Sequence, residues 1–166
     1  MRYVPILRQR ILAIDPHRGG FGFAVLEDDP LQFVDWGISS CGKHDHRTCL
    51  SAVEHLISVY RPTLLVLEDW KQCAEFRRIA LGSFINRISD VFVNGIAIKC
   101  YTRTDVRRVF EDTGALSKYQ IAQTLVTMFP ELEPRLPRPR QAWEGEDRRM
   151  SIFDAASLGL AHLGAR

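Results

Sequence analysis

Three acidic side chains lie where the sequence predicts buried apolar structure. Asp15 follows the apolar run at 11–14, Glu68 follows another at 64–67, and Asp154 interrupts the apolar stretch SIFDAASLGL. An ionised carboxylate beside a core costs several kcal/mol unless it is paired, hydrogen-bonded or bound to a metal ion. The position of each acid therefore needs a physical reason.

A shared metal site would give all three acids the same reason. The carboxyl ends of neighbouring parallel strands lie at one edge of a sheet, so Asp15 and Glu68 can meet there, and a helix packed across that edge can add Asp154. Carboxylate oxygens favour Mg²⁺ or Mn²⁺, and two such ions about 3.5–4 Å apart can activate water and stabilise the leaving oxygen of a phosphodiester. Taken singly, each acid has an ordinary alternative: a turn anchor, a solvated loop residue and a bond to the backbone, respectively.

The apolar patterning predicts one α/β domain in which these acids could converge. A meander with an acid on its first strand, then a helix, an acid-tipped strand and a final acid-bearing helix is the ribonuclease-H-like order. It implies a mixed five-stranded sheet, an antiparallel meander plus parallel strands, with helices on both faces. We expect strands at 11–15, 21–27, 31–39, 63–69 and 95–101, and helices at 47–59, 74–93, 104–110, 117–129 and 150–163.

A proline-rich segment precedes the last helix. Four prolines between 130 and 139 exclude regular structure from much of the stretch that ends near residue 147. We therefore expect a flexible connector at 130–146, within a single domain that spans 1–166.

Length, composition and net charge limit the possible classes of protein less narrowly than the motifs do. The 166 residues, 46% of them hydrophobic, suit one filled domain. No apolar run approaches the roughly 20 residues that span a bilayer, and the first residues lack the pattern of a secretion signal, so we expect a cytoplasmic protein with no membrane partner. The net charge of +2 neither requires nor excludes a polyanionic partner. Between 71 and 118, nine Lys and Arg stand against five acids, which marks either a phosphate-contacting flank or an ordinary solvated surface.

Two of the four cysteines lie in the segment CGKHDHRTC with two histidines. A zinc site there is disfavoured, because His44 and His46 are too close for the usual ligand spacing. We favour a polar loop around Cys41 followed by a helix-buried thiol at Cys49. The other two cysteines, at 73 and 100, are expected to be unpaired thiols of a reducing compartment.

Four segments carry a resemblance to a known family: ILAIDPHRGGFGFAVLE, RPTLLVLEDW, YTRTDVRRVFEDTGALSKYQIAQTLV and FDAASLGLAH. Together they resemble the RuvC-type Holliday-junction resolvases, in the same order and with comparable spacing over nearly the whole chain. The first segment alone is weak evidence, because actin-like ATPases open with a similar strand. Such ATPases need two domains of this kind, and we expect only one in this chain.

The resemblance implies a Mg²⁺-dependent endonuclease of the ribonuclease H fold that cuts branched DNA, usually as a homodimer that places two sites on opposing strands. The catalytic metal ligands of the family fall on Asp15, Glu68 and Asp154. A glycine-to-lysine stretch before a helix matches Gly114 to Lys118, which would make Lys118 a phosphate or transition-state contact. Without the resemblance, Lys118 reads equally well as a charge in the first turn of an exposed helix.

Two positions depart from the family pattern. Ser151 stands where relatives carry an acid or a histidine, and a serine could contribute to a metal only through water. Asp147 lies seven residues before Asp154 and could substitute for the missing ligand, although we favour Asp147 and Glu146 as capping acids. His17 replaces a glycine and is expected at the surface of a turn.

Further residues are candidates for contact with nucleic acid. Trp70 and Lys71 follow Glu68 at a place where the family contacts its substrate, and Trp70 could stack on an unpaired base or simply pack under the next helix. Two other functions remain open: a non-catalytic relative that binds structured nucleic acid through a weakened metal site, and a ribonuclease that processes structured RNA. The basic candidates for phosphate contact are Arg77, Arg78, Arg107, Arg108 and Lys118.

Overall fold

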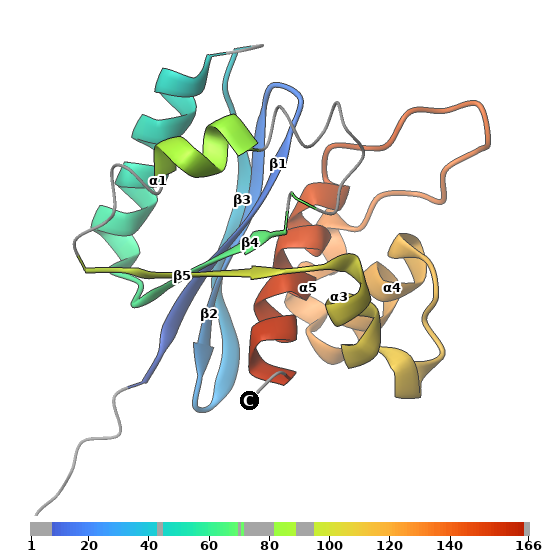
Figure 1. Cartoon of the computed structure of the whole chain (residues 1–166). Helices are drawn as coiled ribbons and strands as arrows, with labels where there is room; N and C mark the ends of the chain where they lie inside the picture. The colour runs from blue at the N-terminus through green and yellow to red at the C-terminus, as the bar shows by residue number, and fades with distance from the viewer. Residues whose placement is uncertain (1–7, 43–44, 70, 72–81, 89–94, 165–166) are drawn as a thin grey trace, which may run out of the picture.

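The computed structural model describes residues 8–42, 45–69, 71, 82–88 and 95–164 (Figure 1). Its strands are β1 (Arg10–His17), β2 (Gly20–Asp28), β3 (Leu31–Ser40), β4 (Leu64–Glu68) and β5 (Ala97–Tyr101). Its helices are α1 (His46–Tyr60), a helical stretch at 82–88, α3 (Arg103–Val109), α4 (Lys118–Met128) and α5 (Met150–Gly164), with short 3-10 helices η2 (Glu111–Thr113) and η3 (Pro130–Arg135).

The strands form one mixed sheet in the order β3-β2-β1-β4-β5. The first three strands pair antiparallel as a meander, whereas β4 runs parallel to β1 and β5 runs parallel to β4. The strand β1 therefore lies at the centre, and its carboxyl end lies beside the carboxyl end of β4. This is the predicted ribonuclease-H-like sheet.

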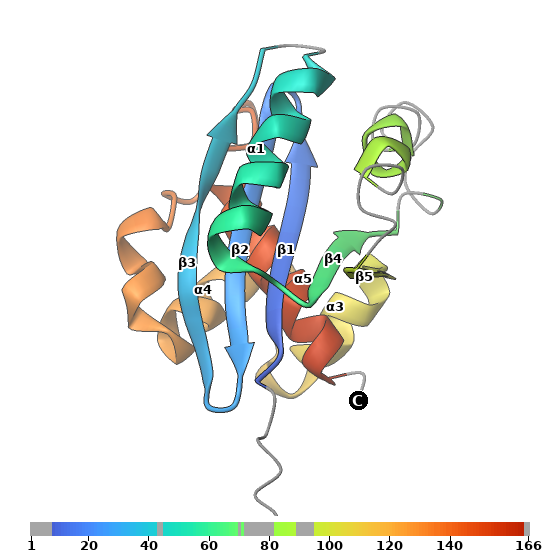
Figure 2. The same cartoon turned by 90° about the vertical axis from the view of Figure 1, so that its left-hand side faces the viewer.

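Helices cover both faces of the sheet (Figures 1 and 2). The helix α1 lies across one face, and α5, with α3 and α4 beside it, lies across the other. Because side chains alternate along a strand, Leu12 and Ile14 pack in the core on the α1 side, while Ile11 and Ala13 pack in the core on the α5 side. The central strands are thus buried on both faces, which explains their nearly continuous apolar sequence.

The helix α5 packs close to the sheet both at its first turn and at Gly159, further along the helix. A Cβ atom added to Gly22 would lie 2.3 Å from the carbonyl carbon of Ser151, and one added to Gly159 would lie 2.6 Å from Leu26 Cδ1. Apart from its last two residues, α5 is buried along its whole length. The absence of side chains on these two glycines therefore sets how near α5, and with it Asp154, can lie to the sheet.

Capping boxes fix the starts of α3 and α4. The Thr102 side chain accepts from the Asp105 amide while the Asp105 carboxylate accepts from the Thr102 amide, and Ser117 and Gln120 form the same reciprocal pair. As a result, Arg103 and Lys118 are each the first helical residue of a well-defined helix. Both side chains belong to the α5 side of the molecule.

Most of the predicted elements are confirmed within a few residues, and one difference has a clear cause. Pro130–Arg135 form a 3-10 helix, which the expectation of a largely irregular 130–146 segment did not include; the apolar Leu132, fully buried, holds it against the core. Of the predicted helix at 74–93, only 82–88 lie within the described residues, and these are helical. Among the described residues, no helix is long and apolar enough to cross a membrane.

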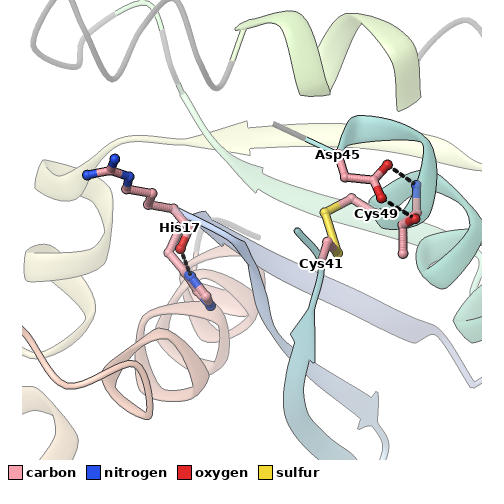
Figure 3. The surroundings of a disulfide bond; sticks show 6 residues. His17, Cys41, Asp45 and Cys49 are labelled. Atoms are coloured by element: carbon pink, nitrogen blue, oxygen red, sulfur yellow. Dashed lines mark hydrogen bonds between the residues drawn. A yellow bond between two sulfur atoms is a disulfide. The ribbon is translucent and has the colours of Figure 1, made fainter. Parts of the chain in front are cut away.

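The predicted thiol at Cys49 is wrong, because Cys49 forms a disulfide with Cys41 (Figure 3). Their Cα atoms are 5.6 Å apart, and the bond joins the chain just after β3 to the first turn of α1. The Cys41 amide also donates to the carbonyl of Gly19, in the turn between β1 and β2. Cys100 is a free, exposed thiol as expected, and Cys73 and His44 lie outside the described residues.

We predict that Gly22→Ala destabilises the fold, because the new methyl group must push the first turn of α5 away from β2. Overpacking of this kind costs about 1–3 kcal/mol of unfolding free energy, which urea denaturation measures. The matched control is Gly145→Ala, where nothing lies within 4 Å of the added Cβ. Equal stability of the two variants would contradict the close approach.

We also predict that loss of the disulfide lowers the unfolding free energy. Closing a loop with a sequence separation of 8 residues contributes about 2–3 kcal/mol through the unfolded chain. Cys41→Ser and Cys49→Ser should lose this amount by urea denaturation under non-reducing conditions, and the free-thiol control Cys100→Ser should not. A stability unchanged in all three variants would show that the bond is not formed.

Candidate active site

Three predicted acids meet at the carboxyl ends of β1 and β4. The strand register pairs Ile14 with Leu67, so Asp15 and Glu68, the next residue on each strand, are neighbours. Strand alternation places both on the face that α5 covers, and α5 contributes Asp154 from its second turn. All three acids are buried.

The acids surround the guanidinium of Arg103, a residue that the sequence had not singled out. Arg103 Nε donates to Glu68 Oε1 at 2.9 Å, and Nη1 donates to Asp154 Oδ1, also at 2.9 Å. Nη2 lies 4.0 Å from Asp15 Oδ1. One cation therefore contacts all three carboxylates.

Lys118 adds a second cation to the same cluster. Its ammonium donates to Asp154 Oδ2 at 2.8 Å and to Glu146 Oε1 at 2.9 Å. Both oxygens of Asp154 thus accept from a positively charged group. Lys118 therefore makes specific contacts and is not simply a solvated charge in an exposed first helical turn.

The electrostatics of the cluster keep both cations charged. Burial opposes the charge of the Arg103 guanidinium, but the carboxylates of Asp154, Glu68 and Asp15 outweigh burial and raise its pKa. For Lys118, burial again opposes the charge, Asp154 and Glu146 favour it, Arg103 disfavours it, and the net effect raises the pKa. The three acids and two cations are consequently held together as a charged network.

An open cavity of about 300 Å³ lies beside the network, between the end of β1 and the start of α5. Asp15, Asp154 and Lys118 line one part of it. Ser151 also lines it, but its hydroxyl donates to the Arg148 carbonyl at 2.7 Å. The cavity is the place where a ligand could reach the acids, and its remaining lining residues are Pro16, His17, Arg18, Glu146, Asp147 and Arg148.

His17 is the last residue of β1 and is half-buried, not at the surface of a turn as predicted. Its Nδ1 lies 3.3 Å from the Arg18 carbonyl (Figure 3), a contact that requires a proton on Nδ1 and leaves Nε2 of the neutral ring as an acceptor. Burial lowers the His17 pKa, and Arg148 adds to the lowering. Nε2 is buried and has no hydrogen-bond partner among the described residues.

Asp147 lies just before α5, which begins at Met150, so it does not share a helical face with Asp154. Its carboxylate accepts from the Arg149 amide at 2.9 Å and pairs with the Arg149 guanidinium at 2.7 Å. This is the arrangement of an acid at a helix start, which was the favoured interpretation. Its partner in that interpretation, Glu146, instead pairs with Lys118.

The predicted nucleic-acid contacts are scattered or lie outside the described residues. Arg107 and Arg108 are exposed on α3, and Arg108 forms an ion pair with Asp105 at 3.5 Å. Lys71 is exposed just beyond β4. The structure does not describe Trp70, Arg77 or Arg78.

A second cavity, of about 430 Å³, adjoins the first and shares Lys118, Glu146 and Asp147 with it. Its other lining comes from the start of α4 and from the chain after η3, including the cationic side chains of Arg138 and Arg140. The proline-rich segment therefore lines a cavity that adjoins the one beside the acids.

The donor chemistry of the cluster fits a hard divalent cation, whereas its present geometry does not. Three carboxylates converging on one positive centre are the ligands that Mg²⁺ and Mn²⁺ prefer. However, the described residues contain no group of three His, Cys, Asp or Glu side chains arranged to bind an ion. The Arg103 guanidinium lies between the acids, so an ion could bind them only after this side chain moves.

Comparison with known proteins identifies the class of fold. No protein-family model and no curated protein matches the sequence. Among solved structures, RuvC of Thermus thermophilus in complex with a Holliday-junction substrate aligns with a TM-score of 0.66 and 14% identity, over 93% of this chain and 92% of that one. The fowlpox virus resolvase with its Holliday-junction DNA aligns with a TM-score of 0.52 and 13% identity, over 95% and 98% of the two chains. The chain therefore has the ribonuclease-H-like fold of the junction resolvases.

We predict that the Lys118 amine resists acylation. A raised pKa leaves less neutral amine at any given pH, and the two carboxylate contacts hold its protons. Under a limiting amount of an amine-selective acylating reagent at pH 8, mass spectrometry should show slower labelling of Lys118 than of Lys99, which is exposed on β5. Equal or faster labelling of Lys118 would contradict its place in the network.

Proposed function

We propose that the chain is a divalent-metal-dependent endonuclease that hydrolyses phosphodiester bonds of branched DNA, as a crossover-junction resolvase does. The observation that carries this proposal is the meeting of Asp15, Glu68 and Asp154 beside an open cavity. Buried acids from three separate elements serve no packing purpose, since burying each charge costs free energy. The resolvase fold makes phosphodiester hydrolysis the chemistry that such a cluster best suits.

In this function, Asp15, Glu68 and Asp154 would hold Mg²⁺ or Mn²⁺, as two ions. When bound, such ions activate water and stabilise the leaving oxygen in phosphodiester hydrolysis. Lys118 would keep a positive charge where a phosphate enters the cavity. Ser151 and Asp147 line the same cavity and could assist only indirectly, since both side chains are engaged locally.

The substrate would approach along the two adjoining cavities. Arg138, Arg140 and Arg148 line these cavities and offer charge to a phosphate backbone. Resolution of a four-way junction requires cuts in two strands, so we also propose a homodimer, with roles in DNA recombination and repair. Trp70, Lys71, Arg77, Arg78, Arg107 and Arg108 remain proposed contacts with the DNA.

One observation favours a second function, a non-catalytic relative that binds structured nucleic acid. Arg103 fills the space between the acids, and a protein that never binds ions would need such a cation permanently. A cytoplasmic location is also part of the proposal, and the Cys41–Cys49 disulfide argues against it, because cytoplasmic thiol pools keep most cysteines reduced.

We predict that the protein nicks a synthetic four-way junction in the presence of Mg²⁺ and that Asp15→Asn lowers the rate by at least about 100-fold, since even outer-shell changes at metal sites commonly cost 10–100-fold. Cleavage is measured on labelled DNA, and the matched control is Asp112→Asn, at an exposed position in η2.

Binding of the junction without cleavage would contradict the nuclease function and support the non-catalytic one. Cleavage of structured RNA in preference to the DNA junction would instead identify a ribonuclease. Equal loss of activity in Asp112→Asn would show that the effect does not arise at the acid cluster.

A further inference from the structure

Arg103 occupies the space that a divalent ion would need. On the basis of the function proposed above, we propose that the Arg103 guanidinium competes with divalent ions for Asp15, Glu68 and Asp154, so that it sets the affinity of the site for metal and is displaced when an ion binds. Arg103 is thus a positioning residue that holds the acids together and a built-in competitor of the metal.

The contacts make the competition direct. Glu68 Oε1 and Asp154 Oδ1 each accept from Arg103 at 2.9 Å, which is hydrogen-bond distance between charged groups. The carboxylate oxygens that face the guanidinium all point into the same space between the three acids. A cation placed at that centre would lie against a guanidinium of like charge.

Charge balance favours exchange over joint occupancy. The three buried acids carry three negative charges, and Arg103 and Lys118 together neutralise two of them. Glu146, the other partner of Lys118, is left out of this balance because its side chain is 48% exposed and water screens its charge. A divalent ion added to both side chains would leave the buried cluster positively charged, whereas an ion that replaces Arg103 leaves it neutral with Lys118. Uncompensated buried charge is costly, so binding of the ion favours release of the guanidinium.

The side chain has a way out that leaves the fold in place. Arg103 is the first residue of α3, and its side chain is 33% exposed although the three acids are nearly inaccessible. The capping box of Thr102 and Asp105 fixes the backbone of this turn independently of the guanidinium. Rotation of the side chain can therefore free the acids without unfolding α3.

The test measures Mn²⁺ binding by the whole protein, with calorimetry and with the electron paramagnetic resonance signal of free Mn²⁺. In Arg103→Gln, we expect Mn²⁺ to bind at least about tenfold more tightly than in the wild type, because a unit charge about 4 Å away is removed from a partly buried site. Arg103→Lys keeps a cation there and should bring the affinity back toward the wild-type value.

A thermal measurement separates competition from a merely structural role. Without divalent ions, Arg103→Gln should melt at a lower temperature than the wild type, because the acids repel one another. With Mg²⁺, it should gain more stability than the wild type gains. A structural ion pair would lower the melting temperature equally in both conditions.

The matched control is Arg10→Gln. Arg10 also pairs with a nearly inaccessible carboxylate, that of Glu27, and its side chain is 37% exposed, but it lies at the other end of β1. We expect this variant to lose stability with no change in Mn²⁺ affinity. If Arg103→Gln folds poorly, Arg103→Met supplies the same comparison with a side chain of similar length.

Unchanged or weaker Mn²⁺ binding in Arg103→Gln and Arg103→Met would overturn the competition, even if the wild type cleaves DNA. Conversely, tighter binding in these variants without cleavage by any form would support the competition and refute the nuclease function. The two proposals can therefore fail separately.

Discussion

The burial of three carboxylates at one edge of the sheet is the constraint on which the rest of the site depends. Three like charges this close repel one another, and burial removes the water that would screen them. Two cations compensate this negative charge, and each is the first residue of a helix: Arg103 on α3 and Lys118 on α4. Each is delivered by a capping box, so the compensation is built into the local backbone and not left to mobile surface chains.

The acids themselves are placed by sheet geometry. Parallel pairing of β1 with β4 puts the two strand ends side by side, and strand alternation turns Asp15 and Glu68 to the same face. The close approach of α5, permitted by Gly22 and Gly159, adds Asp154. The packing of the strands and of α5 therefore determines the distances in the charged network.

The sequence was enough to predict the fold and the three acids, because each of these follows from local pattern. Strands and helices were read from apolar periodicity, and Asp15, Glu68 and Asp154 stood out as charges in apolar runs. Arg103 could not be singled out in the same way, since an arginine at a helix start in a basic region is ordinary. Only its position could have revealed it: Arg103 lies two residues after Tyr101, which pairs with Glu68 in the sheet.

The other differences arise from long-range contacts that pattern does not reveal. The disulfide joins Cys41 and Cys49 because the end of β3 and the start of α1 meet in space, whereas their spacing suited several interpretations. His17 is half-buried because it is the last residue of β1 and lines the cavity beside the start of α5. In the proline-rich segment, the burial of Leu132 outweighs the tendency of its prolines to prevent helix formation.

The most direct test of the central claim is anomalous diffraction at the manganese absorption edge from crystals of the protein equilibrated with Mn²⁺. We expect anomalous density between Asp15, Glu68 and Asp154, together with a guanidinium of Arg103 that has left the three acids. Crystals at saturating Mn²⁺ that show no such density, with Arg103 still paired to Glu68 and Asp154, would contradict it.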